Sequence, residues 1–229
     1  MLTWVVTPTY NERTNIDGLL DRLLGLRPEL AVVVVDDGSP DGTGARVAER
    51  AIAETRLHLL TRPSKDGLAT AYLLGFRHAL AAGAERVVQM DADLSHDPDD
   101  VSRLLASGAD LVLGSRYVPG GGVRNWPVHR QLLSRGGSAY ARLLLGLPQR
   151  DLTGGFKAWR APALRAVLER PVASNGYVFQ AETTLRAARL GFRIEEVPIV
   201  FTEREGGVSK MSGAIAVEAV WRVPRLWWG

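Results

Sequence analysis

Apolar blocks alternate with amphipathic blocks along the first half of the chain. Five mostly apolar segments have the length of strands, at residues 2–8, 31–39, 57–62, 85–93 and 109–117. Three segments between them repeat apolar residues at helical spacing, at residues 15–26, 41–54 and 67–83. The alternation of strand and helix predicts an α/β fold, in which a mostly parallel, doubly wound sheet has helices on both faces.

The second half of the chain is less regular. Residues 119–127 predict a loop and residues 151–156 a tight turn, whereas residues 131–147 and 175–191 predict helices. Residues 192–202 predict one further strand. No internal repeat, low-complexity tract or linker interrupts the chain. With 229 residues and a hydrophobic fraction of 46%, the chain is predicted to form a single domain with its own core.

Composition and charge narrow the possible partners. The chain has no cysteine, so disulfides are excluded. We expect no signal peptide, and no window approaches the roughly 18 apolar residues of a membrane span. Residues 116–170 carry ten arginines and lysines against two acidic residues, a local charge of +8 in a chain whose net charge is +3. This basic middle predicts an anionic partner, such as a phosphate, a nucleotide or an anionic lipid surface.

Acidic residues directly follow two of the predicted strands. Asp36 and Asp37 end the second strand, and Asp91 and Asp93 end the fourth. In an open parallel sheet, the carboxyl ends of the strands meet at one edge, where ligands bind. Asp91 and Asp93 would repel each other there unless a cation or protons intervene. Because oxygen ligands suit Mg²⁺ or Mn²⁺, the pattern predicts a divalent metal at this edge.

Several motifs in a fixed order resemble the inverting family 2 glycosyltransferases with the GT-A fold. PTYNE, VDDGSPDGT and MDADLSHDP follow the first, second and fourth strands. GSRYVPGG, DLTGGFKAWR, GYVFQAE, EEVPIVFTER and GGVSKMS then occur in the order found in dolichol-phosphate (polyprenol-phosphate) mannose synthases. The resemblance covers nearly the whole chain. It implies transfer of mannose from GDP-mannose to a polyprenyl or dolichyl monophosphate, with inversion to a β-linked product.

The resemblance also implies a division of the chain and a donor site. Residues 1–115 would form a nucleotide-binding half, residues 116–212 an acceptor-binding half, and residues 213–229 an amphipathic C-terminal helix. The residues implied for binding GDP-mannose are Pro8, Tyr10, Glu12, Val35, Asp37, Asp91, Ala92, Asp93, Arg116, Arg204 and Lys210.

Individual roles in the donor site follow from the resemblance. Tyr10 is expected near the base, Glu12 toward the ribose hydroxyls, and Asp37 as an acceptor of hydrogen bonds from the guanine. Asp93 is expected to bind the metal directly. The metal ligands implied by the match are Asp91, Asp93 and Ser95. Ser95 stands where family members often carry glutamine, and its shorter hydroxyl would bind weakly or through water.

The acceptor site and the chemistry are implied in the same way. Arg116, Arg130 and Ser134 match positions that hold the acceptor phosphate, and arginine pairs with two phosphate oxygens through its planar fork. Arg204 and Lys210 flank a glycine-containing loop whose cations would neutralise the leaving diphosphate. The acceptor phosphate is already largely anionic at neutral pH, so no strong general base is needed. The residues expected to act in catalysis are Asp93, Arg116 and Lys210.

The apolar tail of such an acceptor predicts peripheral contact with a membrane. Trp221, Trp227 and Trp228, interleaved with Arg222 and Arg225, have the composition of an interfacial helix. A helix packed on the domain is the equal alternative. Some family members continue into transmembrane helices where this chain stops. The expected location is the cytoplasmic face of the membrane, or the cytoplasm if such helices have been removed.

Other nucleotide-binding classes fit the sequence less well. The first strand ends without the G-x-G-x-x-G of nicotinamide enzymes, and no P-loop motif is present. The glycine-rich basic loop of nucleotidyltransferases is also missing there. Nucleic acid is not an expected partner. Two alternatives stay open: a polyprenyl-phosphate glucosyltransferase that uses UDP-glucose, and a non-catalytic nucleotide-binding scaffold.

Overall fold

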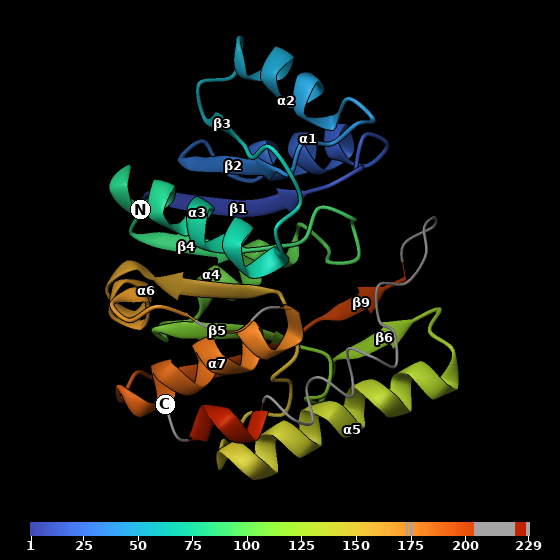
Figure 1. The fold of residues 1–229 in the computed structure, drawn as a ribbon, viewed down its shortest axis with the longest axis vertical. Coiled ribbons are helices and arrows are strands. Elements are labelled where there is room, and N and C mark those ends of the chain that lie inside the picture. The colour runs from blue at the N-terminus through green and yellow to red at the C-terminus, as the bar shows by residue number, and fades with distance from the viewer. Residues whose placement is uncertain (173, 175, 204–222, 228–229) are drawn as a thin grey trace.

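A seven-stranded sheet forms the centre of the molecule (Figure 1). The computed structural model describes residues 1–172, 174, 176–203 and 223–227. The strands lie in the order β3-β2-β1-β4-β7-β5-β8, and β7 alone among them runs antiparallel to its neighbours. Their bounds are β1 (Thr3–Thr9), β2 (Leu30–Asp36), β3 (Leu57–Thr61), β4 (Arg86–Gln89), β5 (Leu111–Ser115), β7 (Lys157–Arg160) and β8 (Ile194–Pro198). A second, two-stranded parallel sheet pairs β6 (Gly122–Arg124) with β9 (Val200–Thr202).

Helices cover both faces of the large sheet (Figure 1). One face packs against α3 (Leu68–Ala81), α6 (Ala161–Leu168) and α7 (Gly176–Arg189), and its core includes Trp4, Phe76 and Trp159. The other face packs against α1 (Ile16–Leu26), α2 (Thr43–Ala51) and α4 (Asp100–Ala106). The long helix α5 (Val128–Leu145) lies apart from the sheet, beside β6. The predicted doubly wound α/β architecture is therefore confirmed.

The strand β2 illustrates why a continuous apolar run occupies the middle of such a sheet. All seven of its residues are buried, and Val32 and Val34 face one core while Val33 and Val35 face the other. Because side chains alternate between the two faces of a strand, a run of valines satisfies both apolar layers at once.

A glycine in the middle of α3 allows that helix to approach the sheet closely. A Cβ atom at Gly75 would lie 2.3 Å from Cγ1 of Val6 in β1. Glycine within a helix costs about 1 kcal/mol relative to alanine. Here the close packing of α3 on β1 requires it, and α3 carries Tyr72 into contact with the edge of the sheet where β4 ends.

The structure differs from the expected elements in the second half of the chain. The helices α4 and α6 and the strands β6 and β7 were not predicted as such. The predicted strand 192–202 divides into β8 and β9, which belong to different sheets. The division falls at Pro198, which has no N–H to continue the pairing, and Ile199 donates its N–H to the Ser115 carbonyl.

The described part of the C-terminal segment packs on the domain. Residues Val223–Trp227 form a short 3₁₀ helix, η1. Val223 is buried in a small apolar cluster with residues of α5 and α7, among them Leu145 and Leu185. Residues 204–222, which include Trp221, and residues 228–229, which include Trp228, lie outside the described residues. Among the residues that the structure describes, no helix is long and apolar enough to cross a membrane.

Candidate active site

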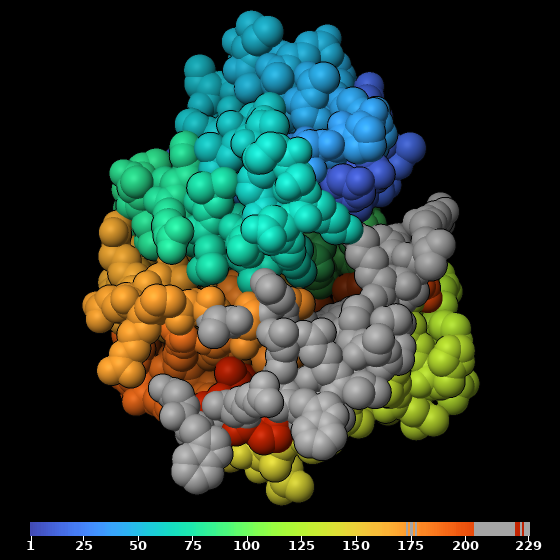
Figure 2. Space-filling view, in the orientation of Figure 1, coloured from blue at the N-terminus to red at the C-terminus, as the bar shows by residue number. Residues whose placement is uncertain are grey.

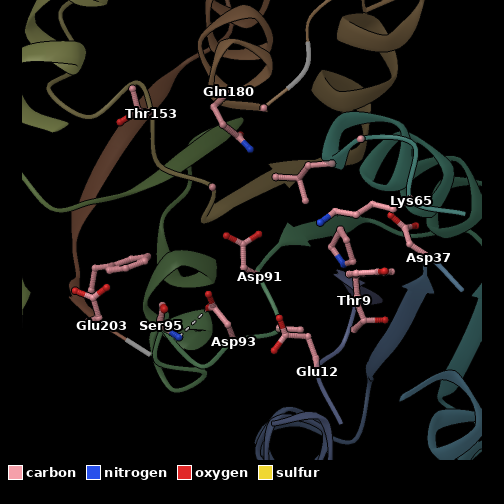
Figure 3. Close-up of a pocket in the computed structure, with 18 of the residues that line it drawn as sticks. Thr9, Glu12, Asp37, Lys65, Asp91, Asp93, Ser95, Thr153, Gln180 and Glu203 are labelled. Atoms are coloured by element: carbon pink, nitrogen blue, oxygen red, sulfur yellow. Dashed lines mark hydrogen bonds between the residues drawn. The ribbon is translucent and has the colours of Figure 1, made fainter. Parts of the chain in front are cut away.

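A pocket of about 450 Å³ opens at the carboxyl ends of β1, β2 and β4. Figure 2 shows this side of the molecule hollowed next to α3 (teal), with the green segment after β4 at depth. Figure 3 shows how acidic and basic side chains from separate loops converge on it. The described residues that line it are Pro8, Thr9, Tyr10, Glu12, Asp37, Lys65, Gly67, Leu68, Asp91, Ala92, Asp93, Ser95, Arg130, Thr153, Gly155, Gly176, Val178, Gln180, Phe201 and Glu203.

The three oxygen-bearing residues predicted to bind metal all line this pocket. Asp91 and Asp93 leave the end of β4, as predicted, and Ser95 follows in the same turn (Figure 3). The Asp93 carboxylate accepts a hydrogen bond of 3.1 Å from the backbone N–H of Ser95. The Asp91 carboxylate accepts one of 2.6 Å from the hydroxyl of Tyr72. Both carboxylates are therefore held by neighbours while lining the same cavity.

This donor set fits a hard divalent cation whose remaining ligands come from water and a bound substrate. Within the described ranges, no group of three or more His, Cys, Asp or Glu side chains is placed to hold a metal by itself. Mg²⁺ is commonly held by only one or two carboxylates, together with waters and substrate phosphates. Two carboxylates and a hydroxyl in a pocket with room for a ligand satisfy that requirement.

His96, next to these residues in sequence, belongs to the core. Its ring stacks on Phe156 at 5.0 Å and meets Phe201 edge-on at 5.1 Å. Burial lowers the pKa of His96, which keeps the imidazole neutral near pH 7. It is not among the residues that line the pocket.

The residues predicted to surround the nucleotide are mostly brought together. Pro8, Tyr10, Glu12, Asp37 and Ala92 line the pocket. Glu12 accepts a hydrogen bond of 2.9 Å from the Asn15 side chain. The structure gives a different place to the Val35 side chain, which is fully buried in the apolar core instead of lining the pocket. It faces α3 because β2 is covered on both sides.

The carboxylate of Asp37 is already paired within the protein. Arg62, just beyond β3, donates to its two oxygens at 2.6 and 2.7 Å. Only 7% of the Asp37 side chain and 12% of the Arg62 side chain are exposed. The resemblance assigns Asp37 hydrogen bonds from a guanine. Any such bond would use lone pairs that Arg62 leaves available.

Sequence reasoning missed several residues that line the pocket. Lys65 is the clearest case: its ammonium group lies 4.7 Å from the centre of the Tyr10 ring, and it points into the cavity (Figure 3). A signal was present, since Lys65 follows the third strand and the carboxyl ends of parallel strands share an edge. Gln180 from α7, by contrast, reaches the pocket only through tertiary packing.

The guanidinium of Arg116 is engaged within the protein. Its guanidinium donates to both carboxylate oxygens of Asp151 at 2.7 Å, and to the Thr153 hydroxyl at 3.0 Å. It also lies over the rings of Tyr117 and Trp126. Arg116 is buried and is not among the lining residues. In this structure the guanidinium of Arg116 is therefore engaged with Asp151 and Thr153, and its expected contact with substrate phosphates stays a prediction.

Two opposing effects act on the pKa of the Asp151 carboxylate. Burial by itself raises the pKa of Asp151, but the adjacent Arg116 charge and its hydrogen bonds outweigh burial and hold that pKa below its ordinary value. Asp151 is therefore ionised at neutral pH, and the pair behaves as a buried salt bridge.

The two remaining acceptor residues lie one turn apart on α5, but only one of them lines the pocket. Arg130 lines the pocket, forms an ion pair with Glu203, and lies 4.1 Å from the centre of the Trp126 ring. Ser134 is buried, accepts a hydrogen bond of 2.6 Å from Tyr117 and does not line the pocket. Of these two residues, Arg130 alone lines the pocket, and the acceptor roles of both stay predictions. Arg204 and Lys210 lie outside the described residues.

A buried lysine fastens α7 to the sheet beside the pocket. Lys157 in β7 is fully buried, and its ammonium group donates to the Gln180 carbonyl at 2.7 Å and to the hydroxyls of Thr183 and Thr184. Burial lowers the pKa of Lys157 to about 7.

This lysine predicts a pH dependence of stability. Its pKa in the unfolded chain is about 10.4, so between pH 7 and 10 the unfolded chain binds a proton that the folded protein lacks, and stability rises with pH. Relative to Lys157→Met, the wild-type free energy of unfolding should gain about 3 kcal/mol between pH 7 and 9.5. The Gln180 carbonyl stays satisfied in the variant, because Thr184 donates to it at 2.9 Å. Urea unfolding at both pH values measures the gain, and parallel profiles would contradict it.

Comparison with known proteins identifies relatives of the whole chain. The sequence model described as Glycosyl transferase family 2 matches residues 4–168. Polyprenol monophosphomannose synthase of Mycolicibacterium smegmatis is 50% identical, and the match covers 99% of this chain and 86% of that protein. Undecaprenyl-phosphate mannosyltransferase of Micrococcus luteus is also 50% identical, with 100% of this chain and 94% of that protein covered.

Solved structures share the fold at lower identity. Glucosyl-3-phosphoglycerate synthase from Mycobacterium tuberculosis, in complex with Mn²⁺, UDP and glucosyl-3-phosphoglycerate, matches with a TM-score of 0.71 and 23% identity, covering 98% of this chain and 79% of that one. The mannosyltransferase PcManGT from Pyrobaculum calidifontis, in complex with GDP-Man and Mn²⁺, matches with a TM-score of 0.58 and 24% identity, covering 98% of this chain and 60% of that one. The GT-A fold expected from the motifs is confirmed by these structures and the family match. Since half of its residues are identical to those of the two named enzymes over nearly its full length, the chain belongs to glycosyl transferase family 2 and, within it, to the polyprenyl-phosphate mannosyltransferases.

Proposed function

We propose that this protein is an inverting glycosyltransferase that moves mannose from GDP-mannose to the phosphate of a polyprenyl or dolichyl monophosphate. The observation that carries the proposal is the convergence of Asp91, Asp93 and Ser95 on one pocket that also contains Tyr10 and Glu12. The first three residues offer oxygen ligands to a cation, and the last two offer an aromatic ring and a carboxylate to a nucleoside.

A divalent cation, Mg²⁺ or Mn²⁺, would be held by Asp91 and Asp93, with Ser95 beside them. When bound, it would neutralise charge that develops on the departing diphosphate. Support comes from the oxygen-only donor set and from the two carboxylates, whose mutual repulsion a cation relieves.

The donor nucleotide would lie across the exits of β1, β2 and β4. Tyr10 offers an aromatic face to the base, and Glu12 offers a carboxylate to the ribose hydroxyls. Lys65 supplies a positive charge on the same side, within reach of phosphate oxygens that enter the pocket. Asp37 would act on the base while Arg62 keeps its carboxylate in place.

The acceptor would enter from the side of Arg130 and Glu203. The arginine offers charged donors to a phosphate, which is already anionic and needs no proton removed before it attacks. The protein's task is then to align the phosphate oxygen with the anomeric carbon on the face opposite the leaving diphosphate. Such an attack inverts an α-linked donor to a β-linked mannosyl phosphate.

A transfer assay tests this function against its alternatives. The protein is incubated with a polyprenyl phosphate, Mn²⁺ or Mg²⁺, and either GDP-mannose or UDP-glucose. The expected product is a β-linked mannosyl phospholipid from GDP-mannose, absent when EDTA is in excess. Transfer from UDP-glucose alone would favour the glucosyltransferase alternative. Binding of GDP without transfer from either donor would favour a nucleotide-binding scaffold.

The outer side of α5 supports the peripheral membrane contact. This helix carries several apolar side chains on the surface: Val128, Leu132, Leu133, Leu143 and Leu144, with exposed fractions from 38% to 83%. Exposed arginines on the same helix, Arg135 and Arg142, give it a positive charge. Apolar residues flanked by arginine suit the interface of an anionic membrane. The same helix brings Arg130 to the pocket, so docking here would place the acceptor's headgroup near the site.

A charge placed on this surface should release the protein from membranes. The variant Leu132→Glu/Leu143→Glu is expected to bind anionic phospholipid vesicles at least about tenfold more weakly, because each leucine buried contributes about 1.5–3 kcal/mol. Transfer to a short, soluble prenyl phosphate should be unchanged. Ile52→Glu is the matched control, since Ile52 is 87% exposed just beyond α2, at the other end of the molecule (Figure 1). Equal vesicle sedimentation of all three proteins would move the membrane contact elsewhere.

A further inference from the structure

A buried tyrosine touches the first carboxylate of the pocket from behind. The side chain of Tyr72, on α3, is completely buried and does not line the pocket. Its hydroxyl donates a hydrogen bond of 2.6 Å to Oδ1 of Asp91. A carboxylate that accepts a short bond from a buried donor has one oxygen committed to the protein.

Two aromatic rings hold this tyrosine in place. The Tyr72 ring stacks on Phe76 one turn later in α3, with ring centres 5.7 Å apart. It also lies nearly parallel to the ring of Phe179 in α7, at 6.3 Å and an interplanar angle of 9°. In a close-packed interior such a ring has no alternative rotamer without displacing its neighbours. The position of the hydroxyl is therefore set by two helices.

Gly155 lies beside the other oxygen of Asp91 and leaves it room. A Cβ atom at Gly155 would come within 3.3 Å of Asp91 Oδ2 and 3.7 Å of the Gln180 side-chain amide nitrogen. Gln180 is itself fixed, because the amide of Gln89 donates to it at 2.9 Å, and Gln89 is the last residue of β4. The segment from Gln89 to Asp91 is thus tied to α3 by Tyr72 and to α7 by Gln180.

We propose that Tyr72 is a positioning residue for the metal–nucleotide site: its hydroxyl bonds to Oδ1 of Asp91 and so holds this carboxylate in the single rotamer in which it meets its ligand. This inference rests on the proposed function. It assigns the Asp91 carboxylate a buried side-chain partner within the protein. Groups that orient a metal-binding carboxylate commonly change metal affinity or activity by about 10- to 100-fold when removed.

The variant Tyr72→Phe tests the proposal, because it deletes only the hydroxyl. Two affinities are measured: that of Mn²⁺, by electron paramagnetic resonance, and that of GDP in the presence of Mn²⁺, by calorimetry. Both are expected to fall about 10- to 100-fold, while circular dichroism and the melting temperature report a folded protein. The KM for GDP-mannose should rise by a similar factor. Unchanged affinities overturn the proposal.

Two further variants separate positioning from packing. Phe76→Leu loosens the stack around Tyr72 but keeps the hydroxyl, so it should lower stability and weaken Mn²⁺ binding by less than Tyr72→Phe does. In an Asp91→Asn background, Tyr72→Phe should cause no further loss, because the residue through which it acts has already been changed. An equal loss in Phe76→Leu, or an additive loss in the double variant, overturns the proposal. If the wild-type protein binds no Mn²⁺ and no GDP, the proposed function fails instead.

Discussion

Asp93→Asn is expected to lower metal-dependent mannosyl transfer by about 1000-fold while the protein stays folded. The expectation rests on charge: removing one of two anionic oxygen ligands from a cation site forfeits about 4 kcal/mol of transition-state stabilisation, and each 1.36 kcal/mol is a factor of ten in rate. The fold should survive because asparagine keeps the oxygen that accepts the bond from the Ser95 N–H. Initial rates across a range of Mn²⁺ concentrations, with melting curves of both proteins, give the measurement.

Asp97→Asn is the matched control for this variant. Asp97 lies in the same loop, is exposed and pairs with Arg22 on the surface, and it does not line the pocket. Surface pairs contribute at most about 1 kcal/mol, so this variant should retain wild-type activity. Full activity of Asp93→Asn, or full wild-type activity in excess EDTA, would falsify the metal assignment.

Asp151→Ala is expected to have the largest effect on stability of any single change considered for this protein. Three donors of Arg116, one of them its backbone N–H, lose their acceptor when the carboxylate is removed. Removing one partner of a buried ion pair typically costs about 3–5 kcal/mol, because an uncompensated charge stays buried. The free energy of unfolding of a natural domain is only about 5–15 kcal/mol, so we expect a large fall in the urea midpoint.

The pH dependence of this pair has a defined sign. The pKa of Asp151 is lowered in the folded protein, so its contribution is complete above the ordinary aspartate pKa. The contribution is lost as the pH falls through the lowered pKa that Asp151 has in the folded protein. The stability difference between wild type and Asp151→Ala should therefore be full at pH 7 and shrink only in strong acid.

A surface pair provides the control for this measurement. Glu29 lies 4.0 Å from Arg27, and both side chains are more than a third exposed. Glu29→Ala should change the free energy of unfolding by no more than about 1 kcal/mol. If Asp151→Ala costs as little as Glu29→Ala, then Arg116 finds other partners in the variant.

Local pattern was sufficient for the N-terminal half of the molecule. A run of four valines is stable where two apolar layers meet, so Val32 to Val35 predicted a central strand without any knowledge of its neighbours. The carboxyl ends of parallel strands meet at one edge, so the alternation of strands with helices was enough to predict that Tyr10, Asp37, Asp91 and Asp93 lie close together, as they do in the pocket. Hydrophobic periodicity and the alternation of strands with helices are local properties, so the sequence carries them.

Tertiary structure decided the rest, because it depends on contacts between residues far apart in the chain. The four residues of β7 are too few for a clear pattern, yet they enter the sheet antiparallel between β4 and β5. Arg116 resembles a phosphate ligand in sequence, but Asp151, 35 positions away, occupies its guanidinium. Tyr72 belongs to an apolar helix face, and only the packing of α3 brings its hydroxyl to Asp91. The type of a residue limits what its side chain can bind. The fold determines which of those possible partners it contacts.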